Sequence, residues 1–155
     1  MTEHEIWMRK ALELAQEAAA AGEVPVGAIV VKEGQIIACA RNEKEALHDA
    51  TAHAEILALR RSGQALGHWQ LSGCTLYVTL EPCPMCAGAI MQSRLSRVVF
   101  GAYDGRAGCC GTLYNLPGDD RFPVHVDVEG GVLREECAAL LTEFFRSRRE
   151  EERIY

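Results

Sequence analysis

Apolar and polar residues alternate with helical spacing in two long stretches, one near each end of the chain. Residues 6–21 place apolar side chains on one face of a helix and charged side chains on the other, as do residues 132–149. Thr2 and Glu5 precede the first stretch in the pattern of a capping box, and Gly22 follows it as a helix stop. The pattern therefore predicts an amphipathic helix at each end of the chain.

Between these two helices, shorter apolar runs predict a sheet and two further helices. The predicted strands are 24–31, 35–40, 74–80, 96–101 and 124–128, and the predicted helices are 52–61 and 83–92. The turn at Glu33-Gly34 joins the first two strands as a hairpin, whereas a helix between 74–80 and 96–101 makes that pair parallel. The strand at 24–31 is apolar almost throughout, which is typical of a sheet covered on both faces. The prediction is an α/β fold, a three-layer α/β/α sandwich with a five-stranded mixed sheet, in a single domain of residues 1–155.

Composition and charge narrow the class of protein. The chain has 155 residues, 48% apolar and 25% charged, which are ordinary values for one globular domain. It has no apolar run of about eighteen residues and no signal-peptide core, so we expect a cytoplasmic protein without a membrane span. The formal net charge of −6 argues against a protein that coats nucleic acid non-specifically. Arg146, Arg148 and Arg149 still form a basic cluster, which charge alone would interpret as a solvated helix end.

The chain contains seven cysteines, an odd number without a secretion signal, so a disulfide framework is not expected. Cys39, Cys74 and Cys137 lie in apolar segments and are predicted to be small core residues. The Cys109-Cys110 pair lies between glycines, where packing in a tight loop is favoured over a place near a pocket. The two remaining cysteines are the candidates for chemistry.

Cys83 and Cys86 stand three residues apart at a predicted helix start, which directs both sulfurs to one side where the helix dipole favours thiolate. Thiolates suit Zn²⁺, and His53 is taken as the third ligand, which leaves one tetrahedral position open for water as in catalytic zinc sites. Glu55 follows His53 by two residues and can reach that water without binding the metal. The sequence therefore predicts one Zn²⁺ per chain, with Glu55 as the catalytic acid and base.

Each half of this pattern also has a plainer interpretation. A Cys-x-x-Cys pair alone can be a redox pair or half of a closed zinc ribbon. A His-Ala-Glu segment alone can be a first helix turn in which the dipole favours the glutamate. The conjunction favours catalysis, in which a zinc-bound hydroxide attacks a ring carbon that carries an exocyclic amine. Glu55 would then pass protons from the water to the ring nitrogen and to the departing ammonia.

Three loop features are candidates for supporting roles. Asn42 lies at a strand end just before the metal histidine, where it could be a turn residue or could hydrogen-bond a bound base or ribose. Asp49 or Thr51 could cap the helix that carries His53. Residues 104–120 form a glycine-rich loop, and such loops often carry binding residues.

With these motifs in place, the chain resembles the bacterial tRNA-specific adenosine deaminases of the TadA type, in the cytidine deaminase-like superfamily. The His-x-Glu and Pro-Cys-x-x-Cys motifs specify the superfamily, and the segments that flank them favour this family. The matching segments are 24–28, 48–49, 51–56, 76–90, 97–102, 111–116, 136–141 and 144–146.

The resemblance implies hydrolytic deamination of the wobble adenosine in a tRNA anticodon to inosine, by a homodimer that contacts the RNA with both subunits. It also implies that Asn42 contacts the flipped base and that Asp104 and nearby residues contact the anticodon. A lysine common in the family two residues after Asp104 is Arg106 here, which keeps the charge. The arginines implied to meet RNA phosphates are Arg146, Arg148 and Arg149.

One segment departs from the family pattern. Members commonly carry an arginine, an aromatic or aliphatic residue, an asparagine and a histidine before the last strand. Here Arg121-Phe122 is followed by Pro123-Val124-His125, so the asparagine is missing and the histidine is displaced. An RNA contact from this loop is then lost or supplied differently.

Two rival interpretations remain at this point. A small-molecule deaminase of guanine or of a cytosine nucleoside would share the zinc chemistry. A non-catalytic, zinc-stabilised RNA-binding or assembly subunit would fill the fourth metal position with Cys109 or Cys110. Glu55 argues against the second rival, because a structural zinc site has no use for that acid.

Overall fold

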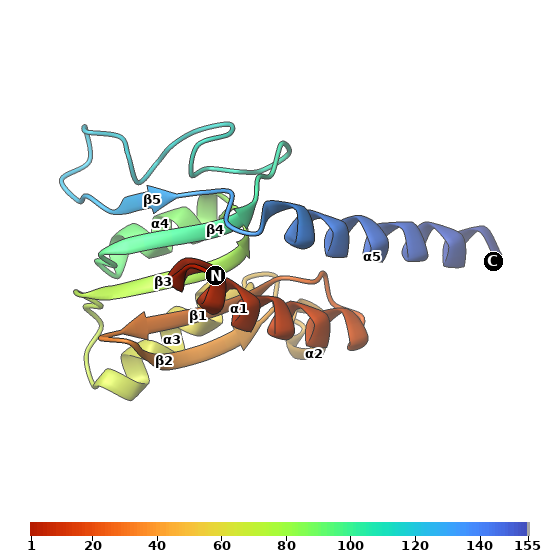
Figure 1. The fold of residues 1–155 in the computed structure, drawn as a ribbon, viewed down its shortest axis with the longest axis horizontal. Helices are drawn as coiled ribbons and strands as arrows, with labels where there is room; N and C mark the ends of the chain where they lie inside the picture. Colours follow the sequence, from red (N-terminus) through yellow and green to blue (C-terminus); the bar gives the residue numbers. More distant parts are fainter. Residues whose placement is uncertain (155) are drawn as a thin grey trace.

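A five-stranded sheet lies between two layers of helices in the computed structural model, which describes residues 1–154 (Figure 1). The strands are β1 (Gly27–Lys32), β2 (Gln35–Arg41), β3 (Cys74–Leu80), β4 (Arg97–Ala102) and β5 (Asp127–Glu129). The helices are α1 (Glu3–Ala20), α2 (Lys44–Leu47), α3 (Ala54–Leu66), α4 (Pro84–Gln92) and α5 (Arg134–Ile154). The strand order is β2-β1-β3-β4-β5.

Alternate residues of the central strands pack into two separate cores, one on each face of the sheet. On β1, Ala28 and Val30 join the core beneath α3 and α4, whereas Ile29 and Val31 join the core beneath α1 and α5. Figure 1 shows α1 in front of the sheet, α3 and α4 behind it, and α5 projecting beyond it. The predicted three-layer α/β/α sandwich is confirmed.

The strand directions position two helix starts at the same edge of the sheet. Strand β1 pairs antiparallel with both β2 and β3, and β3 pairs parallel with β4, as does β4 with β5. The predicted hairpin, the parallel pair and the mixed sheet are therefore confirmed. Because β2 and β3 both oppose β1, their carboxyl ends lie at one edge, and α3 and α4 follow from that edge.

Helix α1 begins as the sequence predicts. The Thr2 side chain accepts a hydrogen bond from the Glu5 backbone N–H (3.1 Å), and the Glu5 carboxylate accepts one from the Thr2 N–H (3.1 Å). Gly22 follows the helix with a φ of 80°, which a glycine adopts without strain.

The predicted helix at 52–61 is displaced and too short. Helix α3 runs from Ala54 to Leu66 and ends at Gly67, whose φ of 78° gives a left-handed cap, so the helix continues through Gly63. Asp49 and Thr51 do not cap it, because the Asp49 carboxylate accepts the N–H and hydroxyl of Thr51 instead. The structure also contains the short helix α2, which the sequence pattern did not predict.

Other boundaries also differ from the predictions, and β1 begins at Gly27 and not at residue 24. Strand β5 spans Asp127–Glu129 and not 124–128, because the residues that pair with β4 begin at Asp127. Helix α5 starts at Arg134, after Leu133 with a φ of 51°, and continues beyond residue 149 to Ile154. Cys39 is exposed, whereas Cys74 and Cys137 are buried in the core as predicted. No helix in the described part of the chain is long and apolar enough to cross a membrane.

Candidate active site

The three predicted metal ligands come from the starts of α3 and α4. His53 is the residue that precedes α3, and Cys83 is the residue that precedes α4, where Pro84 occupies the first helical position. Cys86 lies one turn further into α4 and is buried. Both helices therefore direct their unpaired N–H groups and the positive ends of their dipoles toward the same place.

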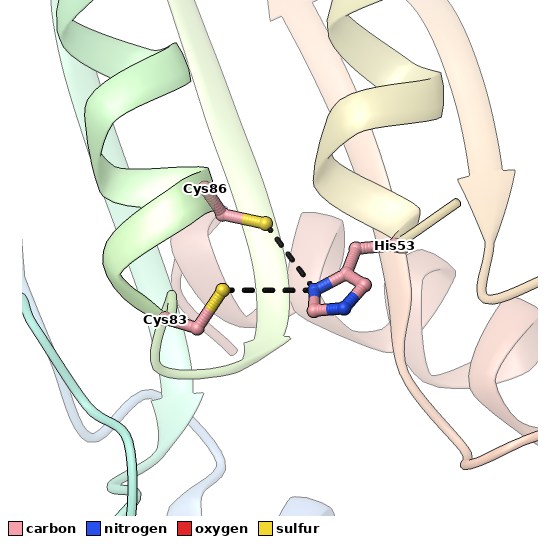
Figure 2. A group of neighbouring side chains, drawn as sticks. All are labelled: His53, Cys83 and Cys86. Atoms are coloured by element: carbon pink, nitrogen blue, oxygen red, sulfur yellow. Dashed lines mark hydrogen bonds between the residues drawn. The ribbon is translucent and has the colours of Figure 1, made fainter. Parts of the chain in front are cut away.

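The ligand atoms converge as a zinc site requires (Figure 2). The His53 Nδ1 atom lies 3.5 Å from Cys86 Sγ and 3.7 Å from Cys83 Sγ, and all three ligand atoms lie within 4.8 Å of one another. In a tetrahedral site, ordinary Zn–S and Zn–N lengths put a sulfur and a nitrogen about 3.6 Å apart. The donor set and its spacing thus fit Zn²⁺ with three protein ligands.

Among the three candidate ligands, the pKa of Cys83 favours the binding of a cation. A hydrogen bond from Cys86 lowers the pKa of the Cys83 thiol to about 4, assisted by His53 and opposed by burial. The same contact, together with burial, raises the pKa of Cys86, and the hydrogen bond with Cys83 raises the pKa of His53. The low pKa of Cys83 favours a thiolate at this position, and thiolates bind divalent cations.

Glu55 lies in the first turn of α3, beside the ligands but outside the group that can hold the metal. Its side chain is 4% exposed, and burial raises its pKa to about 7, although its own backbone N–H and His53 act in the opposite direction. A carboxyl group with a pKa near neutrality can accept and return a proton, which is the property of a general acid and base.

Asn42 connects the end of β2 to the start of α3. Its Oδ1 accepts a hydrogen bond from the Ala54 N–H (2.8 Å), and its Nδ2 donates to the Val24 carbonyl (3.1 Å). The amide thus caps the helix that begins after His53, a role that the sequence analysis gave to Asp49 or Thr51. Asn42 also lines a cavity of about 250 Å³ with Phe145 and other residues, so its proximity to a bound base remains a prediction.

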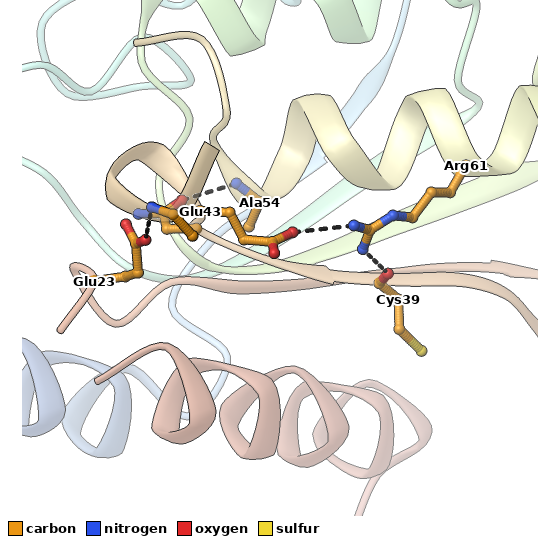
Figure 3. Close-up of polar contacts among 7 residues, drawn as sticks. Glu23, Cys39, Glu43, Ala54 and Arg61 are labelled. Carbon is orange, nitrogen blue, oxygen red and sulfur yellow. Dashed lines mark hydrogen bonds and ion pairs between the residues drawn. The ribbon is translucent and has the colours of Figure 1, made fainter. Parts of the chain in front are cut away.

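Hydrogen bonds with Glu23 and Arg61 hold the segment between Asn42 and His53. The buried carboxylate of Glu23 accepts hydrogen bonds from the N–H groups of Glu45 and Ala46 at the start of α2. Arg61 of α3 donates to the Glu43 carboxylate (3.0 Å) and to the Cys39 carbonyl (2.8 Å), as Figure 3 shows. These contacts fix the path of the chain into α3 and so fix the position of His53.

Glu81 is a site residue that the sequence analysis did not single out. It is 2% exposed and directly precedes Pro82-Cys83. The sequence feature that could have indicated its role is a charged residue at the end of an apolar strand. Burial raises the pKa of its carboxyl group, but hydrogen bonds from Thr112, Asp104 and Cys110 outweigh burial and lower the pKa overall. Glu81 is therefore a carboxylate at neutral pH.

Comparison with known proteins identifies the family. A family model described as MafB19-like deaminase matches residues 2–149. The tRNA-specific adenosine deaminase of Bacillus subtilis (strain 168) is 50% identical over 153 residues, which cover 99% of this chain and 95% of that protein. The chain belongs to the tRNA-specific adenosine deaminase family.

Solved structures of deaminases confirm the fold class. A structure from studies of A-to-I editing by tRNA:A34 deaminases at the wobble position of transfer RNA matches with a TM-score of 0.84 and 40% identity, covering 88% of this chain and 99% of that chain. A guanine deaminase from Nitrosomonas europaea matches with a TM-score of 0.77 and 29% identity, covering 93% of this chain and 85% of that chain. The cytidine deaminase-like α/β/α fold is thus shared by deaminases named for different substrates.

In this deaminase, the predicted RNA contacts of the glycine-rich loop lie at a second cavity. Asp104 and Arg106 line a space of about 600 Å³ together with Val24 and Phe145. The Asp104 Oδ1 atom accepts the N–H groups of Arg106 and Ala107, so one side of this carboxylate is used within the loop. Val24 and Phe145 line both this cavity and the one beside Asn42, which makes the two spaces neighbours.

The predicted basic cluster lies on the projecting part of α5. Arg148 donates to the Gly22 carbonyl, and its guanidinium lies 4.8 Å from the ring centre of Phe144. Arg146 pairs with Glu143 of the same helix, and Arg149 is exposed. Among these arginines, Arg148 lines the cavity beside Asn42, but none of the three metal ligands lines that cavity.

Two further expectations can be compared with the geometry of this deaminase. Within the described residues, the group that can hold a metal contains neither Cys109 nor Cys110, although both are buried. A structural zinc site with a fourth cysteine ligand therefore has no support in the geometry. In the segment that departs from the family pattern, His125 pairs with Asp127 at 3.1 Å and is exposed.

Proposed function

We propose that this protein converts the wobble adenosine of a tRNA anticodon to inosine by hydrolytic deamination. The observation that carries the proposal is the convergence of His53, Cys83 and Cys86 beside the buried acid Glu55, in a chain 50% identical to a tRNA-specific adenosine deaminase. We further propose that the enzyme acts in the cytoplasm.

The protein residues divide the work of this reaction. Zn²⁺ held by His53, Cys83 and Cys86 would supply a Lewis acid that lowers the pKa of water from 15.7 to about 7. Glu55 takes a proton from the attacking water and delivers it to N1 of the adenine ring, while the oxygen bonds to C6. Glu55 then transfers the second water proton to the exocyclic amine, which leaves as ammonia, and a C6 carbonyl remains.

Two neighbouring cavities, one lined by Asn42 and the other by Asp104 and Arg106, form the proposed path for RNA. We assign Asn42 to a contact with the flipped base, which must reach Glu55 to react, and the neighbouring anticodon nucleotides to the cavity that Asp104 and Arg106 line. The net charge of −6 disfavours non-specific binding to phosphates, so we assign the phosphate contacts to the local basic cluster of Arg146, Arg148 and Arg149 on α5. Removing a base from its stack costs a few kcal/mol, which such contacts must offset.

We also propose that the enzyme is a homodimer that associates through the outer faces of α3 and α4. These helices border an apolar groove of about 930 Å³, and Trp69 at this groove is 62% exposed. Trp69→Glu should shift the protein to a monomer in light scattering, whereas Ile36→Glu on the edge strand β2 should not. An unchanged mass for the Trp69 variant would contradict this interface.

Parallel incubation with three substrates tests the proposed function against its main rival. The protein should form inosine in an anticodon stem-loop and should leave free guanine and cytidine unchanged. The match to a guanine deaminase makes guanine the informative competitor. Turnover of guanine without inosine in the RNA would assign the site to a small-molecule deaminase, and no turnover with zinc bound would favour a non-catalytic RNA-binding subunit.

A further inference from the structure

The Glu81 carboxylate holds the glycine-rich loop at three separate points. Its Oε1 accepts hydrogen bonds from the Asp104 N–H (2.9 Å) and the Thr112 hydroxyl. Its Oε2 accepts hydrogen bonds from the N–H groups of Cys110 (3.1 Å) and Thr112 (2.9 Å). The loop therefore closes around one buried charge, which stands at the end of β3 directly before the metal-bearing helix.

Other contacts show that the loop is shaped around this carboxylate. A Cβ atom at Gly108 would lie 2.4 Å from the Glu81 carboxylate, so the backbone approaches it as closely as only glycine allows. The Cys109 N–H also donates to the Pro82 carbonyl (2.9 Å), which ties the same loop to the residue before Cys83. These contacts therefore fix the position of the loop relative to Cys83.

The end of the loop held through Asp104 is the part that faces the proposed RNA path. The N–H groups of Arg106 and Ala107 donate to the Asp104 Oδ1 atom, so the positions of these two residues depend on the position of Asp104. All three line the cavity of about 600 Å³ that Phe145 of α5 also lines. If the Asp104 N–H loses its partner, this end of the loop loses its hydrogen bond to the buried carboxylate.

We propose that Glu81 is a positioning residue for the RNA substrate, which holds Asp104 and Arg106 at the rim of the site without taking part in the proton transfers. This inference rests on the proposed function, because it names the residue that orients the anticodon contacts. It assigns Glu81 to substrate affinity and Glu55 to the chemical step.

Glu81→Gln tests the inference sharply, because an amide cannot accept hydrogen bonds on both sides. Its oxygen can keep the N–H groups of Cys110 and Thr112, while its NH₂ group donates to the Thr112 hydroxyl. The Asp104 N–H then has no acceptor. The reverse orientation leaves two N–H groups facing the NH₂ group and is disfavoured.

For the anticodon stem-loop, Glu81→Gln should raise KM about tenfold, as expected for one lost hydrogen bond to a charged group, with kcat nearly unchanged. The Kd of the same stem-loop, measured in the inactive Glu55→Ala background, should rise by a similar factor. Zinc content should stay at one ion per chain. Hydrogen exchange at the Asp104 amide should become faster, and this readout needs no substrate.

Glu5→Gln is the matched control, because Glu5 is another carboxylate that accepts a backbone N–H, that of Thr2, and lies on α1 outside the proposed site. It should leave KM, kcat and Kd unchanged. If Glu81→Gln does not fold, Thr112→Val removes the hydroxyl donor alone and should raise KM by a smaller factor with kcat unchanged.

Two results would overturn the inference. A folded, zinc-loaded Glu81→Gln variant with wild-type KM and Kd would show that the carboxylate does not govern substrate binding. A loss of zinc or of kcat at unchanged KM would show that Glu81 supports the metal helix instead. If the wild-type protein forms no inosine in the stem-loop, the proposed function fails, whereas exchange at the Asp104 amide still measures the clamp.

Discussion

The carboxyl groups of Glu55 and Glu81 are both buried but have different surroundings. Burial raises the pKa of Glu55 to about 7, whereas the hydrogen bonds around Glu81 outweigh burial and lower its pKa. The first group can therefore exchange a proton near neutral pH, and the second stays charged and serves as an anchor. Two glutamates near one site thus acquire separate tasks from their hydrogen-bond partners.

Replacing Glu55 by glutamine should abolish the reaction while keeping the metal. Because general acid–base catalysis contributes at least about 100-fold, kcat should fall by that factor or more. Zinc content and unfolding temperature should stay close to the wild-type values, since Glu55 is not a ligand. Glu13→Gln on the exposed face of α1 is the control. Near wild-type turnover with intact zinc would contradict the assigned role.

Removing one sulfur should remove the metal together with the activity, unlike the change at Glu55. Cys83→Ala leaves two protein ligands, so stoichiometric zinc should be lost on dialysis and activity should be lost with it. Metal analysis measures the first effect. Cys39→Ala, which alters an exposed cysteine, should keep one zinc per chain. Tight zinc in the Cys83 variant would show that the ligand assignment is wrong.

The packing of α1 on β1 depends on the absence of a side chain at Gly27. A Cβ atom there would lie 2.0 Å from the Ala11 carbonyl oxygen and 2.6 Å from the Ala15 nitrogen, both in the backbone of α1. Helix α1 can therefore pack this closely on β1 only because residue 27 is a glycine. This close approach also closes the core that contains Met8 and Ile29.

Gly27→Ala should lower the free energy of unfolding by about 3 kcal/mol or more, because helix and strand must separate to admit the methyl group. Gly88→Ala is the matched control in α4, where an added Cβ has no neighbour within 4 Å. That change should raise the free energy of unfolding by about 0.5–1 kcal/mol through helix propensity. Chemical denaturation measures both, and equal effects would contradict the packing argument.

Contacts among distant segments join the layers of the complete fold. His4 of α1 shares a hydrogen bond of 2.8 Å with the Tyr77 hydroxyl of β3 and lies 3.6 Å from the Glu129 carboxylate of β5. Burial raises the pKa of the Tyr77 hydroxyl to about 12, assisted by Glu3. The neutral phenol is therefore the form that the folded protein favours.

This shift predicts a loss of stability at alkaline pH. A pKa raised by folding contributes stability below the unfolded value of about 10, and the contribution disappears as pH rises toward the folded value. Tyr77→Phe, which has no proton to lose, should show a shallower decline in the free energy of unfolding between pH 9 and pH 11. The test is urea denaturation across this range, and parallel curves for the two proteins would exclude the effect.

Much of the architecture could be predicted from residues that lie close together in the chain. The Thr2–Glu5 capping box, the alternation along β1 and the Cys83–Cys86 spacing are local patterns, because caps, strand faces and helix turns depend on a few neighbouring positions. The helix and strand ends were less predictable. Helix α3 continues through Gly63 to Gly67, since glycine is tolerated inside a helix that tertiary packing stabilises.

The amino-acid sequence by itself determined the three-layer class, the residue types that can bind a metal and the acidic residue near them, since these follow from local pattern and side-chain chemistry. The tertiary structure alone decided how they meet. Strand β1 aligns β2 and β3 so that two helix starts share one edge, and Asn42 caps a helix twelve residues away. Glu81 anchors a loop 23 to 31 residues away, and such contacts arise only when distant segments pack together.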